Sequence, residues 1–368
     1  MEEAPLGGLS PQVFLRRHWQ KRPLLVRGAL PGFRGVIGKT ALFALAARDD
    51  IESRLVKRHR NRWTVTHGPL TQSRLKKAGA QDWTLLVNGV NGHREPAERL
   101  LRRFAFIPQS RLDDVMVSYA VRGGGVGPHF DSYDVFLIQG SGRRIWRLAR
   151  KQAFECEARA PLRLIRNFVA EEEYLLEPGD LLYLPPGWGH DGIALDACFT
   201  CSVGFRAPRG AELAAAFLDY LHERGLPDAA YRDPDLRVAR NPAKIGGSMT
   251  AFADAVLNRI RWNRADAIEL LGRHLTTPKN NVVFKKRSKL GSLNDGIAVL
   301  DPKAQLLYAG KRFFINGDCF VPRASQRRAL ARLADRRRAP GRLLARAGLE
   351  PLISDWQRAG YLRLEPSP

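Results

Sequence analysis

The stretch from residue 123 to residue 140 reads GGGVGPHFDSYDVFLIQG. Its second half is rich in β-branched and aromatic residues and ends at a glycine, which predicts a strand. Its first half places glycines just ahead of His129 and Asp131. Positions i and i+2 of a strand share a face, so this imidazole and this carboxylate can converge on one point. The stretch therefore predicts a pair of ligands carried by a sheet.

Short strand patterns surround this stretch, from about residue 112 to residue 205. They read LDDVMVSYAV before it, and RRIWRLA, EYLLEPGDLLYLPPGWGHDGIAL and CFTCSVGFRAP after it. Dense short strands with Gly/Pro corners favour an antiparallel barrel or sandwich. Residues 1–207, including a capped helical segment near the start, are expected to form this antiparallel barrel or sandwich. The fold class predicted for the chain is β-rich α+β.

The period of the apolar residues changes after residue 207. GAELAAAFLDYLHERGL has apolar residues three and four apart, and TAFADAVLNRIRWNRADAIELLGRHL is a second helical region. Helices outside a barrel must bury their apolar faces, either on a second copy of the chain or on the barrel itself. We expect residues 208–276 to form a helical region that makes a homodimer.

The last part of the chain, residues 290–368, predicts a small winged-helix-like domain. Asn316-Gly317 lies between apolar runs in LLYAGKRFFINGDCFVP, which is a strong hairpin signal. Helical patterns and a last short strand follow. The run DRRRAPGR within this part is interpreted in two ways that stay open, as a contact with RNA or as a solvated helix end.

The composition favours an anionic partner. The chain of 368 residues has 60 Lys+Arg against 37 Asp+Glu, a formal net charge of +23, and RNA is the largest pool of anions in a cell. The alternative is an Arg-rich composition that spreads its charge without focusing it. The start, MEEAPLGGLS, lacks an apolar core, and no apolar run approaches the roughly 18 residues of a membrane span. We expect a cytoplasmic protein with no membrane partner.

Cysteine chemistry is not expected. Cys198 and Cys201 form a C-x-x-C, but this motif lies in a strand pattern and no second Cys/His pair lies nearby. Two buried thiols are the expected reading of this motif.

A third ligand for the His129 and Asp131 pair should come from a distant strand. His190 in LPPGWGHDG is the best candidate, because it follows a Pro-Pro-Gly corner. Two histidines and one carboxylate leave coordination positions open, as in non-haem Fe(II) oxygenases. The alternative is a set of ordinary hydrogen-bonded core histidines. The spacing predicts an Fe(II) site that uses dioxygen.

Such an iron needs an electron source, and 2-oxoglutarate supplies one. Strand alternation in GSGRRIWRL places Arg144, Trp146 and Leu148 on one face, the buried one. A buried guanidinium needs an anion, and its planar fork suits the distal carboxylate of 2-oxoglutarate. A structural ion pair with a nearby aspartate is the alternative. Thr200 is expected to add a hydrogen bond to the co-substrate.

The motifs GGGVGPHFDSYDVFLIQGSGRRIWR, EPGDLLYLPPGWGHDG and SVGFRAP together resemble the bacterial JmjC-type ribosomal oxygenases. RHWQKRPLLVRG near the start is similar to the opening of that family. The resemblance implies a JmjC barrel, which is a cupin-like double-stranded β-helix, a helical dimerisation region and a winged-helix domain. It also implies that His129, Asp131 and His190 bind Fe(II) and that Arg144 binds 2-oxoglutarate. A serine is expected at the position of Ala120 and an asparagine near Thr200, so both positions depart from the family.

The resemblance further implies a substrate, an arginine side chain of a large-subunit ribosomal protein of the uL16 type, which would be hydroxylated. Its guanidinium should meet a carboxylate near the iron, for which Asp114, Asp134 and Asp191 are candidates. The glycines before His129 would allow a substrate backbone to approach closely, or would only form a tight bend. Two alternatives remain: an N-methyl demethylase of the same oxygenase class, and a non-catalytic cupin-like assembly factor that binds ribosomes or RNA.

Overall fold

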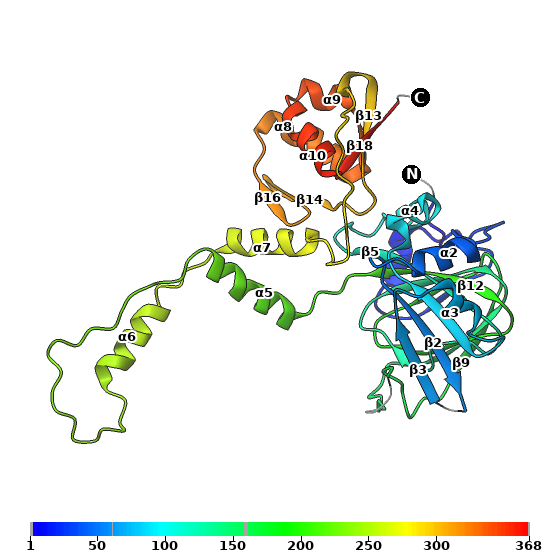
Figure 1. Cartoon of the computed structure of the whole chain (residues 1–368), viewed down its shortest axis with the longest axis horizontal. Helices are drawn as coiled ribbons and strands as arrows, with labels where there is room; N and C mark the ends of the chain where they lie inside the picture. The colour runs from blue at the N-terminus through cyan, green and yellow to red at the C-terminus, as the bar shows by residue number, and fades with distance from the viewer. Residues whose placement is uncertain (1–2, 61, 158–160, 367–368) are drawn as a thin grey trace. The chain divides into compact units, whose positions relative to one another are not determined.

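The structure is a computed structural model that describes residues 3–60, 62–157 and 161–366 (Figure 1). The chain divides into two compact units. The first unit comprises the residues up to Ala207 together with Pro278–Ala304 and the residues from Arg328 onward. The second comprises Pro208–Thr277 and Gln305–Arg327. The division into three domains expected from the sequence stays a prediction.

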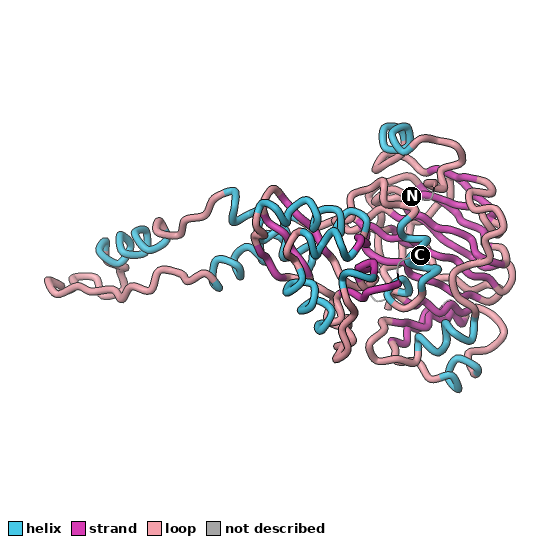
Figure 2. The backbone as a smooth tube through the Cα atoms, turned by 90° about the horizontal axis from the view of Figure 1, so that it is seen from above, coloured by secondary structure: helices cyan, strands magenta, loops and turns pink. Residues whose placement is uncertain are grey.

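Two antiparallel sheets form the barrel of the first unit, whose strands are shown in magenta in Figure 2. The larger sheet contains, in spatial order, β1 (Leu24–Val26), β10 (Leu181–Leu184), β7 (Val135–Ser141), β12 (Cys198–Phe205), β5 (Leu112–Ala120), β4 (Trp83–Val87), β2 (Ser53–His59) and β3 (Arg62–His67). The smaller sheet contains β6 (His129–Phe130), β11 (Gly189–Ala194), β8 (Arg144–Ala149) and β9 (Glu172–Leu176). From β5 onward the chain passes repeatedly between the two sheets. The predicted barrel class is confirmed.

Short helices precede and flank the barrel strands. They are α1 (Pro11–Arg17), α2 (Lys39–Ala46), α3 (Gln72–Lys76), the 3-10 turn η1 (Val90–Gly92) and α4 (Glu95–Arg102). The hydroxyl of Ser10 accepts a hydrogen bond from Val13 N, so α1 begins at the serine cap that the sequence predicts. The main core contains fully buried aromatic side chains from α1 and the larger sheet, among them Phe14, Phe136 and Tyr183. This packing fixes the wall on which the functional site is built.

The glycines ahead of His129 are packed against the barrel's own backbone. A Cβ atom on Gly124 would lie 2.2 Å from the carbonyl oxygen of Trp83, in β4. A Cβ atom on Gly125 would lie 2.4 Å from the carbonyl oxygen of Gly192, in β11. The missing side chains therefore let this segment lie tightly between two strands, which favours the explanation by local chain packing over that by substrate approach.

The second unit contains α5 (Gly210–Glu223), α6 (Gly247–Leu257), α7 (Arg264–Thr276), β14 (Leu306–Ala309), β15 (Arg312–Ile315) and β16 (Asp318–Phe320). The single helical region expected around residues 250–275 is two helices. The reason is a capping box at Asn263, whose side chain accepts from Ala265 N while Asp266 accepts from Asn263 N. The predicted hairpin is confirmed: Asn316 and Gly317, with φ of 50° and 96°, connect β15 to β16.

The C-terminal part contains a sheet in the order β17 (Arg338–Pro340), β13 (Gly296–Leu300) and β18 (Leu362–Pro366). Its helices are η2 (Leu293–Asp295), α8 (Ala324–Arg336), α9 (Gly341–Arg346) and α10 (Glu350–Ala359). The order helix, strand, two helices, strand from α8 to β18 is consistent with a winged-helix-like fold. The middle strand of this sheet, β13, precedes α8 in the sequence.

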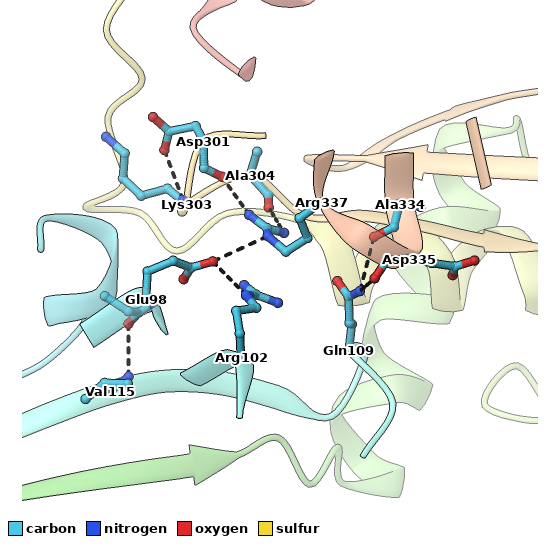
Figure 3. Close-up of polar contacts among 11 residues, drawn as sticks. Glu98, Arg102, Gln109, Val115, Asp301, Lys303, Ala304, Ala334, Asp335 and Arg337 are labelled. Carbon is cyan, nitrogen blue, oxygen red and sulfur yellow. Dashed lines mark hydrogen bonds and ion pairs between the residues drawn. The ribbon is translucent and has the colours of Figure 1, made fainter. Parts of the chain in front are cut away.

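Arg337 joins this C-terminal part to the barrel (Figure 3). The guanidinium is buried, and it donates to the carbonyl oxygens of Ala304 at 2.8 Å and Asp301 at 2.7 Å. Its Nε lies 3.5 Å from Oε1 of Glu98 on α4, the same oxygen that accepts from Arg102 at 2.6 Å. A buried guanidinium thus contacts acceptor oxygens from two stretches that are far apart in the sequence, residues 301–304 and Glu98.

Across the described ranges of the chain, we find no helix that combines the length and apolar character required to span a bilayer.

Candidate metal centre and co-substrate pocket

Three potential metal ligands meet on the smaller sheet. His129 lies on β6 and pairs directly with His190 on the antiparallel strand β11. Their ring nitrogens and a carboxylate oxygen of Asp131 all lie within 4.8 Å of one another. The expectation that one strand carries both His129 and Asp131 is wrong in one detail, because β6 ends at Phe130. Asp131 follows the strand, and its carboxylate still reaches within 3.7 Å of Nε2 of His190.

Backbone carbonyls orient both imidazole rings. Nδ1 of His129 lies 2.8 Å from the carbonyl oxygen of Gly127, and Nδ1 of His190 lies 3.1 Å from that of Trp188. A carbonyl oxygen can only accept, so each Nδ1 carries the proton. Each Nε2 therefore keeps a lone pair, which is the arrangement of metal-binding histidines whose second nitrogen is fixed by a hydrogen bond.

His190 is neutral at physiological pH. Burial, followed by the neighbouring His129, lowers the pKa of His190 to about 4, although Asp131 acts in the opposite direction. A metal ion binds the neutral form of imidazole, so no proton has to leave this ring before a metal binds.

A cavity of about 470 Å³ opens beside the three ligands. Asp114, Met116 and Ser118 line it from β5, where alternate residues share a face. Four residues of strand span about 13 Å, so Asp114 and Ser118 lie toward different ends of the cavity. Ser118 contacts Arg144, which places a cationic end and an acidic end in the same cavity.

Arg144 forms the cationic end. Its side chain is 4% exposed, as strand alternation predicts, and Nη1 donates to the hydroxyl of Ser118 at 3.3 Å. Nε and Nη2 have no hydrogen-bond partner, and no carboxylate of the described residues forms an ion pair with this guanidinium. The alternative of a structural ion pair with an aspartate therefore finds no support.

Other buried polar atoms on the same cavity also have no hydrogen-bond partner in the part of the chain that the structure describes. They are Nε of Arg54, the hydroxyl of Thr84 and Nε1 of Trp146. Buried polar groups in proteins are nearly always paired, so several orphans around one cavity indicate an absent polar ligand. Two orphan nitrogens on one guanidinium fork match the two oxygens of a carboxylate. The donor set therefore fits an anionic co-substrate beside a metal ion.

The acidic end combines Asp113 and Asp114 with Lys279. The Lys279 Nζ lies 3.0 Å from an oxygen of Asp113 and 3.9 Å from one of Asp114. Burial, together with the charge of Asp113, raises the pKa of Asp114 to about 6, while Lys279 and the hydrogen bond from Gly89 N oppose this shift. Arg206 Nε also lies 3.4 Å from Asp113, so Asp113 contacts two cations, whereas among the described residues Asp114 forms an ion pair only with the more distant Lys279.

The three aspartates proposed for substrate binding lie in different environments. Asp114 lines the cavity, whereas Asp134 and Asp191 are not among the described residues that line it. The carboxylate of Asp134 is fully buried and accepts from the hydroxyl of Tyr183 at 2.6 Å and from Gln20 at 3.0 Å. Burial raises the pKa of Asp191, which is half-buried.

Thr200 and Ala120 are the two positions at which the sequence departs from the family pattern. The hydroxyl of Thr200 donates to Gln139 at 3.0 Å, and Thr200 is not part of the described cavity lining. This placement gives no support for contact with the co-substrate. Ala120 packs in a small apolar cluster, and the hydroxyl beside Arg144 comes from Ser118, two residues earlier on the same face of β5.

Sequence reasoning missed Asp113, Ser118 and Lys279. Ser118 could have been found from β5 alone, because it alternates with Asp114 and Met116. Lys279 could not, since it comes from a polar stretch after α7, far from the barrel in sequence. Cys198 and Cys201 are buried free thiols, as expected, and burial raises the pKa of Cys201 to about 12.

The barrel and its His-Asp-His cluster define a JmjC-type domain, and the family model described as JmjC domain matches residues 99–213. A crystal structure of Escherichia coli YcfD superposes with a TM-score of 0.84 and 31% identity, covering 97% of this chain and 99% of that one. YcfD is described as a ribosomal oxygenase in a second structure that is 32% identical. The chain therefore belongs to the JmjC-domain ribosomal oxygenase family.

Named relatives agree with this assignment. Over 233 residues the chain is 43% identical to the ribosomal protein uL16 3-hydroxylase of Escherichia coli. The matched region covers 63% of this chain and 62% of that protein. It is 36% identical over 236 residues to a probable ribosomal oxygenase of Haemophilus influenzae, over 56% of that protein's length. A further YcfD structure, with a TM-score of 0.81 and 32% identity over 97% of this chain and 99% of that one, contains cobalt and 2-oxoglutarate.

Proposed function

We propose that the chain is an Fe(II)- and 2-oxoglutarate-dependent hydroxylase that acts on an arginine side chain of a uL16-type ribosomal protein. The observation that carries this proposal is a single cavity that joins three metal-ligand side chains, a buried guanidinium with two orphan nitrogens and a pair of carboxylates. The Escherichia coli relative named as a uL16 3-hydroxylase supports the substrate, and the YcfD complex with cobalt and 2-oxoglutarate supports the cofactors.

His129, Asp131 and His190 would hold the ferrous ion. Two neutral imidazoles and one carboxylate leave open positions for a chelating co-substrate and for dioxygen. When bound, the iron and 2-oxoglutarate supply the oxidation: one atom of dioxygen enters a C–H bond of the substrate, and the other enters succinate as carbon dioxide is released. The protein's contribution is to fix the ligands through the carbonyls of Gly127 and Trp188.

Arg144 would bind the distal carboxylate of 2-oxoglutarate through the two nitrogens that lack partners. The Ser118 hydroxyl fixes the third nitrogen and so orients the fork. The hydroxyl of Thr84 and the indole N–H of Trp146 remain to complete the polar contacts. Apolar side chains that line the same cavity, including Leu137 and Met116, exclude water from the reacting atoms.

Asp114 would bind the substrate guanidinium, and its replacement by asparagine tests this role. We expect Asp114→Asn to raise the KM for an arginine-containing uL16 peptide about 10- to 100-fold, because a charge-assisted hydrogen bond contributes about 1.5–3 kcal/mol. Because the pKa of Asp114 is about 6, kcat/KM of the unaltered protein should fall as the pH drops below about 6. The asparagine variant should lose this acid limb.

The same variant should be more stable at neutral pH. A carboxyl whose pKa is raised in the folded state contributes stability below its unfolded pKa of 3.8, and this stability is lost as the pH rises through about 6. Asparagine avoids that loss, so its unfolding midpoint in urea at pH 7 should rise. If Asp114→Asn kept both the KM for the peptide and the fall of kcat/KM at low pH, Asp114 would have a structural role instead.

Lys279 would compete with the cationic substrate for the acidic end. Replacing Lys279 with methionine should lower the KM for the arginine peptide about 2- to 5-fold, the range for a half-exposed ion pair. Lys279 is 48% exposed in its pairs with Asp113 and Asp114, so the effect is modest. Lys286→Met, at an exposed lysine of the same segment, is the matched control and should leave KM unchanged. A higher KM in Lys279→Met would mean that the ammonium positions the substrate.

We further infer that the second unit forms a homodimer. Large apolar side chains on and between its helices are solvent-exposed, with exposures of 67% at Leu218, 63% at Leu257 and 59% at Trp262. No residue of α6 is buried within this chain. A second copy of the chain would cover these faces. Localisation in the cytoplasm follows from the proposed ribosomal substrate.

The proposed activity is tested with the purified chain, Fe(II), ascorbate, 2-oxoglutarate, air and purified uL16 protein. We expect uL16 to gain the mass of one oxygen atom on an arginine, with one succinate formed per turnover. His129→Ala should lose both products, and the exposed His59→Ala should keep them. Oxygen on another residue would refute the arginine assignment, and loss of a methyl group would identify a demethylase. If neither hydroxylated uL16 nor succinate formed, the result would favour the alternative of a non-catalytic assembly factor.

A further inference from the structure

A stripe of arginines follows one face of α8. Arg328, Arg332 and Arg336 lie four residues apart, so they share a helix face at spacings of about 6 Å. Arg338 follows on β17, and all four side chains are exposed. We call these four residues the arginine cleft, because they line a hollow of about 1030 Å³.

Both cationic and apolar residues line the hollow. The apolar ones include Ile297 of β13 and Ala339 of β17. Asp335 is the sole carboxylate among the described residues that line the hollow. Four guanidinium groups therefore face one concave surface with little compensation from the chain itself.

Helix stability does not account for the stripe. On α4, Arg99 and Arg102 each pair with a glutamate four residues earlier. On α8, the residue four positions before Arg332 is Arg328, and the residue four before Arg336 is Arg332. Like charges at this spacing destabilise a helix. None of the four cleft arginines forms an ion pair with a described residue, in contrast to the arginines of α4.

We propose that the arginine cleft binds the phosphate backbone of RNA. A guanidinium fork binds phosphate in bidentate fashion, and a regular row of forks matches a polymer of phosphates better than it matches a single small anion. The formal net charge of +23 adds long-range attraction for such a polymer. The choice of RNA over other polyanions rests on the proposed function, because a ribosomal-protein substrate assembles with RNA.

The test measures binding of a fluorescein-labelled RNA stem-loop to the full chain by anisotropy at several salt concentrations. The variant replaces Arg328, Arg332 and Arg336 with glutamine. Its matched control carries the same three substitutions at Arg232, Arg237 and Arg240, which are exposed on another part of the chain. No iron, co-substrate or peptide is present, so a failure here is distinct from a failure of the hydroxylase assay.

The cleft variant should bind RNA at least about 10-fold more weakly than the unaltered chain near 100 mM salt. The slope of log Kd against log salt should also fall by about 2 to 3, because three phosphate contacts are lost. The control should keep both values within about 2-fold. If both variants lost RNA affinity equally, binding would depend on the net charge of the chain and not on the arginine cleft. If neither variant lost affinity, the proposed site would be refuted. Tighter binding to a DNA stem-loop of the same sequence would refute RNA as the partner.

Discussion

Replacing Arg144 with methionine should raise the KM for 2-oxoglutarate about 100- to 4000-fold. Removing one partner of a buried, hydrogen-bonded charge pair costs about 3–5 kcal/mol, because the remaining charge loses its counter-ion in a site without water. Here the group that loses its partner is the distal carboxylate, since the two free nitrogens of Arg144 are the ones assigned to it. Succinate formation at a range of 2-oxoglutarate concentrations measures the effect.

A neighbouring arginine supplies the control for this prediction. Arg143 lies beside Arg144 but is exposed, and its Nε pairs with Asp196 at 2.9 Å. Arg143→Met should therefore leave the KM for 2-oxoglutarate unchanged. The Arg144→Met protein should also lose the rise in melting temperature that 2-oxoglutarate with Co²⁺ gives the unaltered protein. A normal KM in Arg144→Met would mean that another group binds the co-substrate carboxylate.

Replacing Arg337 with methionine should lower the free energy of unfolding by about 3 kcal/mol, the largest effect we expect on stability. The guanidinium serves the carbonyls of Asp301 and Ala304 and the carboxylate of Glu98 at once (Figure 3). Methionine fills part of the volume but removes the donor to the carbonyl oxygen of Ala304, whereas Glu98 keeps its bond from Arg102 and the Asp301 carbonyl keeps its bond from Ala304 N. Urea unfolding followed by tryptophan fluorescence measures the loss.

Two comparisons separate the contacts of Arg337 from its backbone. Arg337 has φ of 54°, in the left-handed region that disfavours side chains by about 1 kcal/mol or more. Arg337→Gly relieves this strain, so it should destabilise the protein less than Arg337→Met does. Arg338→Met, at the exposed neighbour, should change stability by less than about 0.5 kcal/mol. If all three variants were equally stable, the buried network would contribute nothing to folding.

Local patterns were sufficient to predict that His129, Asp131 and His190 lie together and that Arg144 points inward. His129 and Asp131 are separated by one residue along the chain, and His190 follows a Pro-Pro-Gly corner that precedes a strand. The burial of Arg144 followed from strand alternation with Trp146, which the structure reproduces. Each of these signals depends on only a few neighbouring residues, because a strand fixes the direction of its side chains with a period of two.

Other parts of the site were beyond such patterns. Asp114, Asp134 and Asp191 look alike in sequence, and their separation into one cavity residue and two others depends on which strand packs on which. The sequence predicts that Thr200 contacts the co-substrate, whereas its hydroxyl donates to Gln139 on the neighbouring strand β7. Cross-strand register, which arises from pairings between distant residues, decides such cases.

Short-range periodicity and turn chemistry in the sequence were enough to predict the barrel class, the clustering of His129, Asp131 and His190, the inward guanidinium and the Asn316-Gly317 hairpin. Tertiary structure alone decided that Ser118 meets Arg144, that Lys279 reaches the acidic end and that Arg337 joins the C-terminal part to α4. These contacts join segments far apart along the chain. Long-range packing and the pairing of buried charge select them, and no local pattern encodes either.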